Sequence, residues 1–191
     1  MTPALGSLND RLVALATAWP TGGGYAFEPG ARMGPEHNPR DPEHDGTGVN
    51  LHWRGEGVAR GHTDGATYCC GVTLGLVWQT LGANVDAIDD VSAFIDTWFC
   101  PTIGHGGCVD ALVNWGLGTE VEANLAVPGD LCQFWRNTSS EAASGHSVLF
   151  LGWEDGDRVR YWSSQASTNG VGVKVETIGA EWDLRFARLG A

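Results

Sequence analysis

The sequence predicts an α+β fold in which helices pack on an antiparallel sheet of five to six strands. Two observations lead to this prediction. Apolar residues recur at helical spacing up to Gly118. After Gly118, short β-branched or aromatic runs alternate with turns rich in Gly and Asp. Helices followed by consecutive strands are typical of a sheet that carries its helices on one face.

Four helices are expected in the first part of the chain, over residues 8–18, 69–81, 88–99 and 108–117. Asn9 or Asp10 can cap the first helix, and Pro20 followed by three glycines ends it. Gly82 closes the second helix and Gly118 closes the fourth.

Five strands are expected in the second part, over residues 131–136, 147–153, 158–164, 171–178 and 182–189. Pro128-Gly129-Asp130 and Asn169-Gly170 mark two of the turns that separate them. We find no domain boundary, so residues 1–191 are interpreted as a single domain. The segment 28–66 is rich in Gly, Pro, His and acidic residues, and we expect it to be a long irregular loop that borders the functional site.

Composition limits the classes of partner. The chain has 191 residues, a formal net charge of −12 and a pI near 4.7, so nucleic acid and anionic membranes would repel it. No apolar run approaches the ~20 residues that cross a bilayer. The first residues do not show the pattern of a secretory signal, which favours a cytoplasmic location. We expect no cofactor, and the oligomeric state stays open.

The cysteines point to thiol chemistry. Five cysteines, an odd number, do not fit a disulfide framework, so reduced thiols are expected, with Cys100, Cys108 and Cys132 buried. Cys69 and Cys70 lie where a loop gives way to the second helix. Free backbone N–H groups and the helix dipole favour a thiolate there. A small buried apolar residue is the alternative interpretation.

Two later segments supply partners for such a thiol. His146 follows Gly145 at the start of a strongly apolar strand, and Ser163-Ser164-Gln165 ends the next strand. A hairpin between these strands would bring Gln165 near His146, and a helix packed on the sheet would bring a cysteine near both. A cysteine nucleophile needs a base, usually histidine, and a polar group that orients the ring. Backbone N–H groups at a helix start can bind the oxyanion.

These segments resemble the NlpC-type cysteine peptidases and amidases, which have a papain-like fold. The resemblance rests on Tyr68-Cys69-Cys70-Gly71, Pro128-Gly129-Asp130-Leu131, Gly145-His146 and the polar end of the following strand. It implies a papain-like cysteine hydrolase that cleaves an amide bond in a peptidoglycan stem peptide or a related peptide. It also implies Cys69 as the nucleophile, because Gly71 follows two residues later, and His146 as the base. Gln165 is the expected orienting residue, with Ser163, Ser164 and Asn169 as alternatives.

The chain departs from the family pattern in two places. Tyr68 stands where the family has aspartate, and the strand after His146 carries no second histidine. Gly24-Tyr25 matches the aromatic residue that often lies upstream in the family. The candidate substrate-binding residues are Tyr68, Trp53, Trp162 and Ser164.

Three alternatives remain. His105 is a rival base, although its Gly-rich surroundings favour an exposed loop position. A metal site is possible in principle on the histidines and carboxylates His37, His44, His52, His62, Glu36, Asp41, Glu43, Asp45 and Asp64, but their irregular spacing favours no metal site. The competing functional class is a non-catalytic peptide- or glycan-binding module that keeps the same fold with a structural Cys69.

Overall fold

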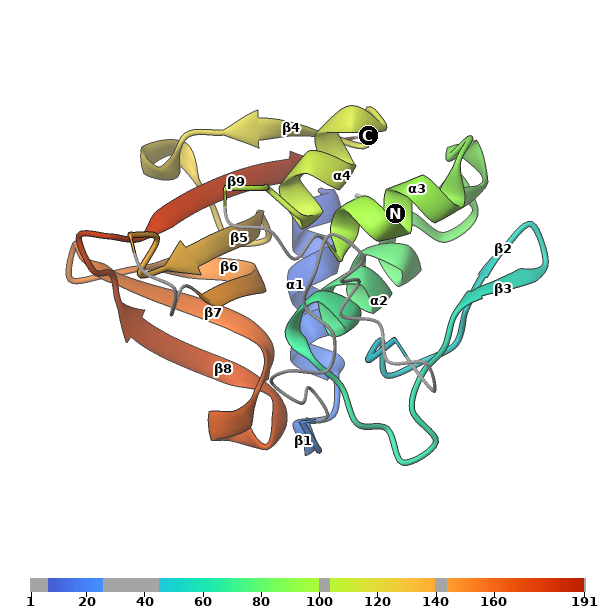
Figure 1. Cartoon of the computed structure of the whole chain (residues 1–191), viewed down its shortest axis with the longest axis horizontal. Coiled ribbons are helices and arrows are strands. Elements are labelled where there is room, and N and C mark those ends of the chain that lie inside the picture. The colour runs from blue at the N-terminus through green and yellow to red at the C-terminus, as the bar shows by residue number, and fades with distance from the viewer. Residues whose placement is uncertain (1–6, 26–44, 100–103, 140–143, 191) are drawn as a thin grey trace, which may run out of the picture.

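The computed structural model describes residues 7–25, 45–99, 104–139 and 144–190. These residues form an α+β structure with four α-helices and nine strands, of which seven make one antiparallel sheet in the order β1-β8-β7-β6-β5-β9-β4. Figure 1 shows the sheet on one side of the molecule and the helices on the other. The predicted class and the antiparallel sheet are therefore confirmed, and the sheet has more strands than the five to six expected.

The first two helices have the predicted bounds, α1 at Leu8–Ala18 and α2 at Cys69–Leu81. The other two are shorter than predicted, α3 at Val91–Trp98 and α4 at Cys108–Asn114. Helix α3 begins late because the Asp90 side chain caps it by accepting from the backbone N–H of Ala93.

All five predicted runs are strands: β5 Leu131–Arg136, β6 Ser144–Glu154, β7 Arg158–Gln165, β8 Gly170–Thr177 and β9 Asp183–Leu189. The edge strands β1 (Gly22–Gly23) and β4 (Gly118–Val121) were missed. They are short and contain glycine, so they lack the β-branched pattern that identifies a strand.

The prediction of an irregular loop over 28–66 is wrong for residues 51–59, whereas the described residues 45–50 and 60–66 form no helix or strand. Residues 51–59 form a separate hairpin of β2 (Leu51–Trp53) and β3 (Glu56–Ala59), seen at the edge of the helical layer in Figure 1. Arg54 and Gly55 connect the two strands with φ of 49° and 87°, the left-handed conformation that tight hairpins need. Arginine is unusual in this conformation, so Arg54-Gly55 carries no clear turn signal. Residues 28–44 lie outside the described part of the chain.

Two apolar clusters lie on the two faces of the sheet. On one face, α1, α2 and α4 cover residues such as Leu131, Leu149 and Trp162. The other face carries a second buried cluster: Cys132, Phe134, Val148, Phe150, Val159, Tyr161 and Phe186. Because successive side chains of a strand point to opposite faces, residues two apart on β5, β6 and β7 share this aromatic face.

Glycines on α2 allow a backbone segment to cross the helix directly. A Cβ atom at Gly71 would lie 2.3 Å from the carbonyl oxygen of Asp45, and one at Gly75 would lie 2.6 Å from that of Thr47. The segment that precedes the hairpin therefore packs against the first turns of α2, beside Cys69 and Cys70.

The Pro128-Gly129-Asp130 turn ties α1 to the sheet. The carboxylate of Asp130 is fully buried and accepts hydrogen bonds from Asn9 Nδ2 (2.8 Å) and the backbone N–H of Val127 (2.8 Å). Arg188 on β9 adds two more, from Nε (2.9 Å) and Nη2 (2.8 Å). This turn fixes the position from which β5 begins.

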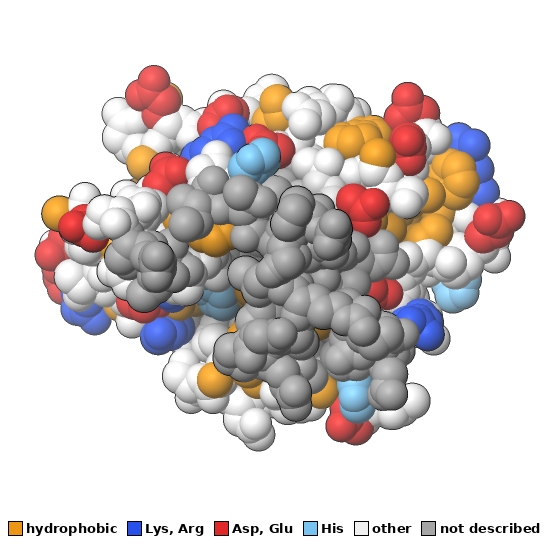
Figure 2. All heavy atoms as spheres, viewed as in Figure 1, with side chains coloured by type: hydrophobic (Ala, Val, Ile, Leu, Met, Phe, Trp, Pro, Cys, Tyr) orange, Lys and Arg blue, Asp and Glu red, His pale blue; other side chains and the backbone are white. Residues whose placement is uncertain are grey.

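No helix in the described ranges is long and apolar enough to span a bilayer. On the face shown in Figure 2, acidic side chains occupy several separate places among the described residues, and Lys and Arg side chains are fewer. This distribution among the described residues matches the acidic composition.

Candidate active site

Cys69 and Cys70 form the first turn of α2. The side chain of the N-cap residue Tyr68 makes no capping hydrogen bond to the first turn of the helix. The backbone carbonyl groups of Cys69 and Cys70 are held by hydrogen bonds. Thr73 Oγ1 contacts the carbonyls of Cys69 (2.9 Å) and Cys70 (3.1 Å), and Trp98 Nε1 donates to that of Cys70 (2.9 Å). The first turn is therefore held rigidly.

The two thiols have opposite electrostatic environments. A hydrogen bond from the Cys70 thiol, the charge and hydrogen bond of His146 and the backbone N–H of Ser147 hold the pKa of Cys69 well below its ordinary value, against the opposing effect of burial. Burial and the neighbouring Cys69 sulfur raise the pKa of Cys70 well above its ordinary value. Of the two thiols, Cys69 therefore has the lower pKa, and Cys70 is the thiol placed to donate to it. The choice of Cys69 as nucleophile stays a prediction.

His146 lies on β6 and is 6% exposed. Its ring contacts those of Phe134 and Tyr161 edge-on, at centroid distances of 5.4 and 5.6 Å. Because its Nε2 has no hydrogen-bond partner among the described residues, we infer that Nδ1 is the nitrogen that faces the Cys69 sulfur. The rival base His105 is exposed, and its carbonyl accepts from Trp135 Nε1 at 2.9 Å.

Strand alternation explains how His146 is presented. Its side chain shares the aromatic face with Phe134, whereas the body of α2 packs on the other face, against Leu149 and Trp162. The backbone pairing of β6 with β7 begins at Leu149 and Trp162, so the His146 end of β6 extends beyond it. The first turn of α2 reaches the ring at this strand end, where the backbone N–H of Ser147 also meets the Cys69 sulfur.

Gln165 lies at the end of β7 with its amide orientation fixed. Its Nε2 donates to Thr168 Oγ1 (2.7 Å) and to the carbonyl of Gly172 (3.4 Å). Thr168 Oγ1 in turn donates to the carbonyl of Gly170 (2.5 Å), so it accepts from the amide. Gln165 Oε1 is buried and, like His146 Nε2, has no partner among the described residues. No hydrogen bond joins the two residues in that part of the chain, so the orienting role of Gln165 stays a prediction.

The alternative orienting residues have other roles. Ser163 Oγ donates to the carbonyl of Ser147 at 2.7 Å, and Asn169 takes the left-handed conformation of the turn into β8. Ser164 bonds Thr67.

Tyr25 joins the site from the segment after β1. It forms a bridge with Thr67, two residues before Cys69. Burial and the charges of Cys69 and Cys70 raise the pKa of the Tyr25 hydroxyl, and Arg136 opposes this rise. A neutral hydroxyl near both sulfurs is a hydrogen-bond donor, and the upstream aromatic residue noted in the sequence therefore lies at the site.

The four candidate substrate-binding residues are not gathered around Cys69 on an open surface. Tyr68, Trp162 and Ser164 are at most 3% exposed and belong to the interior. Trp162 packs edge-on against Trp19 at 5.9 Å. Trp53 lies on the hairpin, whose His52 carbonyl accepts from Trp78 Nε1. Trp78 is nine residues along α2 from Cys69, a distance of about 14 Å.

The other cysteines are in the core. Cys108 and Cys132 are fully buried thiols, as predicted, and burial raises the pKa of Cys108 to about 12. Cys100 lies outside the described residues. Within those residues, no group of three or more His, Cys, Asp or Glu side chains is arranged to hold a metal ion. Five of the candidate ligands lie beyond the described ranges: His37, His44, Glu36, Asp41 and Glu43.

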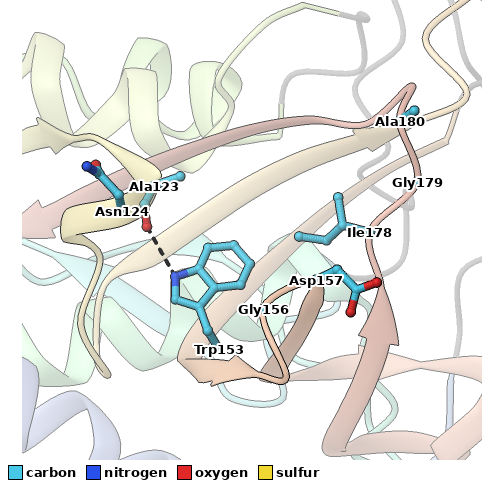
Figure 3. Close-up of a pocket in the computed structure, with 8 residues that line it drawn as sticks. All are labelled: Ala123, Asn124, Trp153, Gly156, Asp157, Ile178, Gly179 and Ala180. Carbon is cyan, nitrogen blue, oxygen red and sulfur yellow. Dashed lines mark hydrogen bonds between the residues drawn. The ribbon is translucent and has the colours of Figure 1, made fainter.

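A groove lies away from the cysteines, between β6 and the turn that follows β8. It has a volume of about 750 Å³ and is lined by Trp153, Ile178, Ala123, Gly156 and Gly179, among others. Figure 3 shows Trp153 and Ile178 beside each other in this groove. Trp153 is seven residues after His146 on the same strand, which corresponds to about 23 Å. The groove is therefore remote from the thiols.

Sequence reasoning missed the aromatic surroundings of His146. Phe134 on β5 and Tyr161 on β7 share its face, and Arg136 and Glu176 are linked to them. Alternation along the predicted strands was the available signal, since it places Phe134 and Arg136 on one face of β5.

Comparisons of the chain with family models, with curated proteins and with solved structures gave no match.

Proposed function

We propose that this chain is a papain-like, NlpC-type cysteine hydrolase that cleaves an amide bond through an acyl-enzyme on Cys69. One observation carries the proposal: the thiol at the start of α2 meets an adjacent thiol, a histidine and a backbone N–H, and these contacts lower its pKa while the pKa of the adjacent thiol is raised. A structural cysteine has no need of this environment.

The residues suggest the following chemistry. The Cys69 thiolate attacks the amide carbonyl, and the backbone N–H of Cys69 with the Tyr25 hydroxyl stabilises the oxyanion. The His146 imidazolium gives its proton to the leaving amine. Neutral His146 then takes a proton from water, which attacks the thioester and releases the acid and the Cys69 thiolate. The substrate class, a peptidoglycan stem peptide or a related peptide, is what the motif resemblance implies.

Turnover measurements test the proposal. The wild-type chain and the Cys69→Ala variant are incubated with peptidoglycan fragments and a panel of fluorogenic peptide amides. We expect hydrolysis by the wild type and none by Cys69→Ala, while the core variant Cys132→Ala keeps its activity. A peptide chloromethyl ketone should label Cys69 alone. Uniformly unreactive thiols in the folded chain would contradict the proposal and favour the binding module.

A further inference from the structure

The His146 ring is enclosed by two other aromatic rings. Phe134, His146 and Tyr161 come from the neighbouring strands β5, β6 and β7, and their centroids form a triangle with sides of 5.4, 5.6 and 5.6 Å. Their interplanar angles lie between 64° and 75°, the edge-to-face geometry that aromatic rings prefer. Packing on two sides restricts how far the imidazole can rotate.

Tyr161 is in turn held by its hydroxyl group. The hydroxyl donates to Glu176 Oε2 at 2.6 Å, and burial together with this carboxylate raises the pKa of Tyr161. Arg136 binds both oxygens of the same carboxylate, Nε to Oε1 at 3.1 Å and Nη2 to Oε2 at 2.8 Å. Such two-point ion pairs fix geometry as well as charge.

The ion pair also locks the shape of the sheet. Arg136 is on β5 and Glu176 on β8, with β6 and β7 between them. Three strand spacings amount to about 14 Å in a flat sheet. The Phe134 and Tyr161 rings, two strands apart, lie only 5.6 Å from each other, so the sheet curls around the aromatic face where this contact forms. The Arg136 guanidinium also lies 4.7 Å from the centre of the Phe134 ring. The same arginine therefore contacts Phe134 and, through Glu176, holds Tyr161.

We propose that Phe134 and Tyr161, locked by the Arg136–Glu176 pair, are positioning residues that hold the His146 ring in the orientation from which it meets Cys69. This inference rests on the proposed function, in which Cys69 and His146 are the reacting pair. None of the four residues needs to touch substrate, because each acts through the imidazole.

The charges around His146 fit this role. The groups that face it are Cys69 from α2, Tyr161 from β7 and the linked pair of Arg136 and Glu176 from β5 and β8. Lys174 Nζ also lies 3.3 Å from Glu176 Oε2. Glu176 neutralises Arg136, so the imidazolium does not face an unpaired guanidinium.

The test compares variants of the full chain by the rate at which iodoacetamide alkylates Cys69 between pH 5 and pH 9. Tyr161→Phe keeps the ring and removes the hydroxyl, and Glu176→Gln removes the ion pair. Glu120→Gln is the matched control, because Glu120 makes a similar two-point pair with Arg185 away from the site (2.8 and 3.1 Å). We expect about tenfold slower alkylation at pH 6 in the two test variants, because misplacing one group of a reacting pair has effects of this size or larger.

At pH 9 the rates should match the wild type, and Glu120→Gln should match it throughout. Unchanged alkylation profiles in folded Tyr161→Phe and Glu176→Gln would overturn the proposal, and Glu176→Gln alone decides if Tyr161→Phe does not fold. A wild type in which Cys69 reacts no faster than an ordinary thiol at pH 6 would instead overturn the proposed function.

Discussion

Thr67 Oγ1 donates a hydrogen bond of 2.8 Å to Ser164 Oγ and so joins the residue two before Cys69 to the end of β7. Both residues are buried, and Thr67 also bridges Tyr25 and Thr47. This hydroxyl pair fixes the chain entering α2 relative to the strand that neighbours β6, and hence Cys69 relative to His146.

Removing this bond should affect both stability and reactivity. Thr67→Val leaves the Ser164 hydroxyl buried without its donor, and we expect a loss of about 1–3 kcal/mol in the free energy of unfolding. Alkylation of Cys69 at pH 6 should also slow. Urea denaturation and iodoacetamide labelling measure the two effects. Thr80→Val is the control, because Thr80 Oγ1 donates to the Leu76 carbonyl within α2 and should change stability alone.

Cys70 should lower the pKa of Cys69 but should not be able to replace it as the nucleophile. In Cys70→Ala the thiolate of Cys69 loses a hydrogen-bond donor, so its pKa should rise. Alkylation of Cys69 should slow at pH 6 and stay unchanged at pH 9, where the thiol ionises in both proteins. Mass spectrometry of the labelled chain measures this, with Cys132→Ala as the control. A reactive thiol that survives in Cys69→Ala and vanishes in Cys70→Ala would reverse the assignment.

The parts of the fold that the sequence predicted are those governed by local rules. Helix α2 was found with its exact bounds because its apolar run starts after a loop and ends at Gly82. The strands β5 to β9 were found because turn residues such as Asn169-Gly170 separate β-branched and aromatic runs. The predicted pairing of Cys69 with His146 rests on motif order on these elements.

The parts that were missed depend on tertiary contacts. The Arg54-Gly55 turn uses a left-handed arginine, which no propensity rule favours. Gly71 was interpreted as a motif residue, although its structural reason is the backbone of Asp45 crossing the helix. The contact between Arg136 and Glu176 depends on the curl of the whole sheet, so no local pattern could show it.

Gly71 should tolerate no side chain. A Cβ there would lie 2.3 Å from the Asp45 carbonyl oxygen, a backbone atom that cannot rotate away. We expect Gly71→Ala to lower the free energy of unfolding by about 3 kcal/mol, at the upper end of ordinary overpacking. Gly57→Ala on β3 is the control, since nothing lies within 4 Å of its added Cβ. Chemical denaturation measures both, and equal stability of the two variants would contradict the close approach.

The ion pair of Arg188 with the buried carboxylate of Asp130 should contribute more to stability than a surface pair. In Arg188→Gln the buried carboxylate loses its cation but keeps the hydrogen bonds from Asn9 and Val127, and we expect a loss of about 1–3 kcal/mol. Arg158 pairs with Asp155 at 3.2 Å on the surface, so Arg158→Gln should cost at most about 1 kcal/mol. Thermal unfolding of both variants checks the contrast, and similar melting temperatures would argue against a structural role for the Pro128-Gly129-Asp130 turn.

The Glu176 carboxylate should make stability depend on pH in the acidic range. Burial disfavours its charge, but the hydrogen bonds of Arg136 and Tyr161 and the charges of Arg136 and Lys174 prevail and lower the pKa of Glu176 to about 2. A carboxyl group whose pKa is lower in the folded chain stabilises the fold above its unfolded pKa of about 4.3. This contribution is lost as the pH falls through about 2. The difference in melting temperature between the wild type and Glu176→Gln should therefore be largest above pH 5 and shrink steadily below pH 4. A difference that stays constant down to pH 2 would show that the ionised carboxylate does not stabilise the curled sheet.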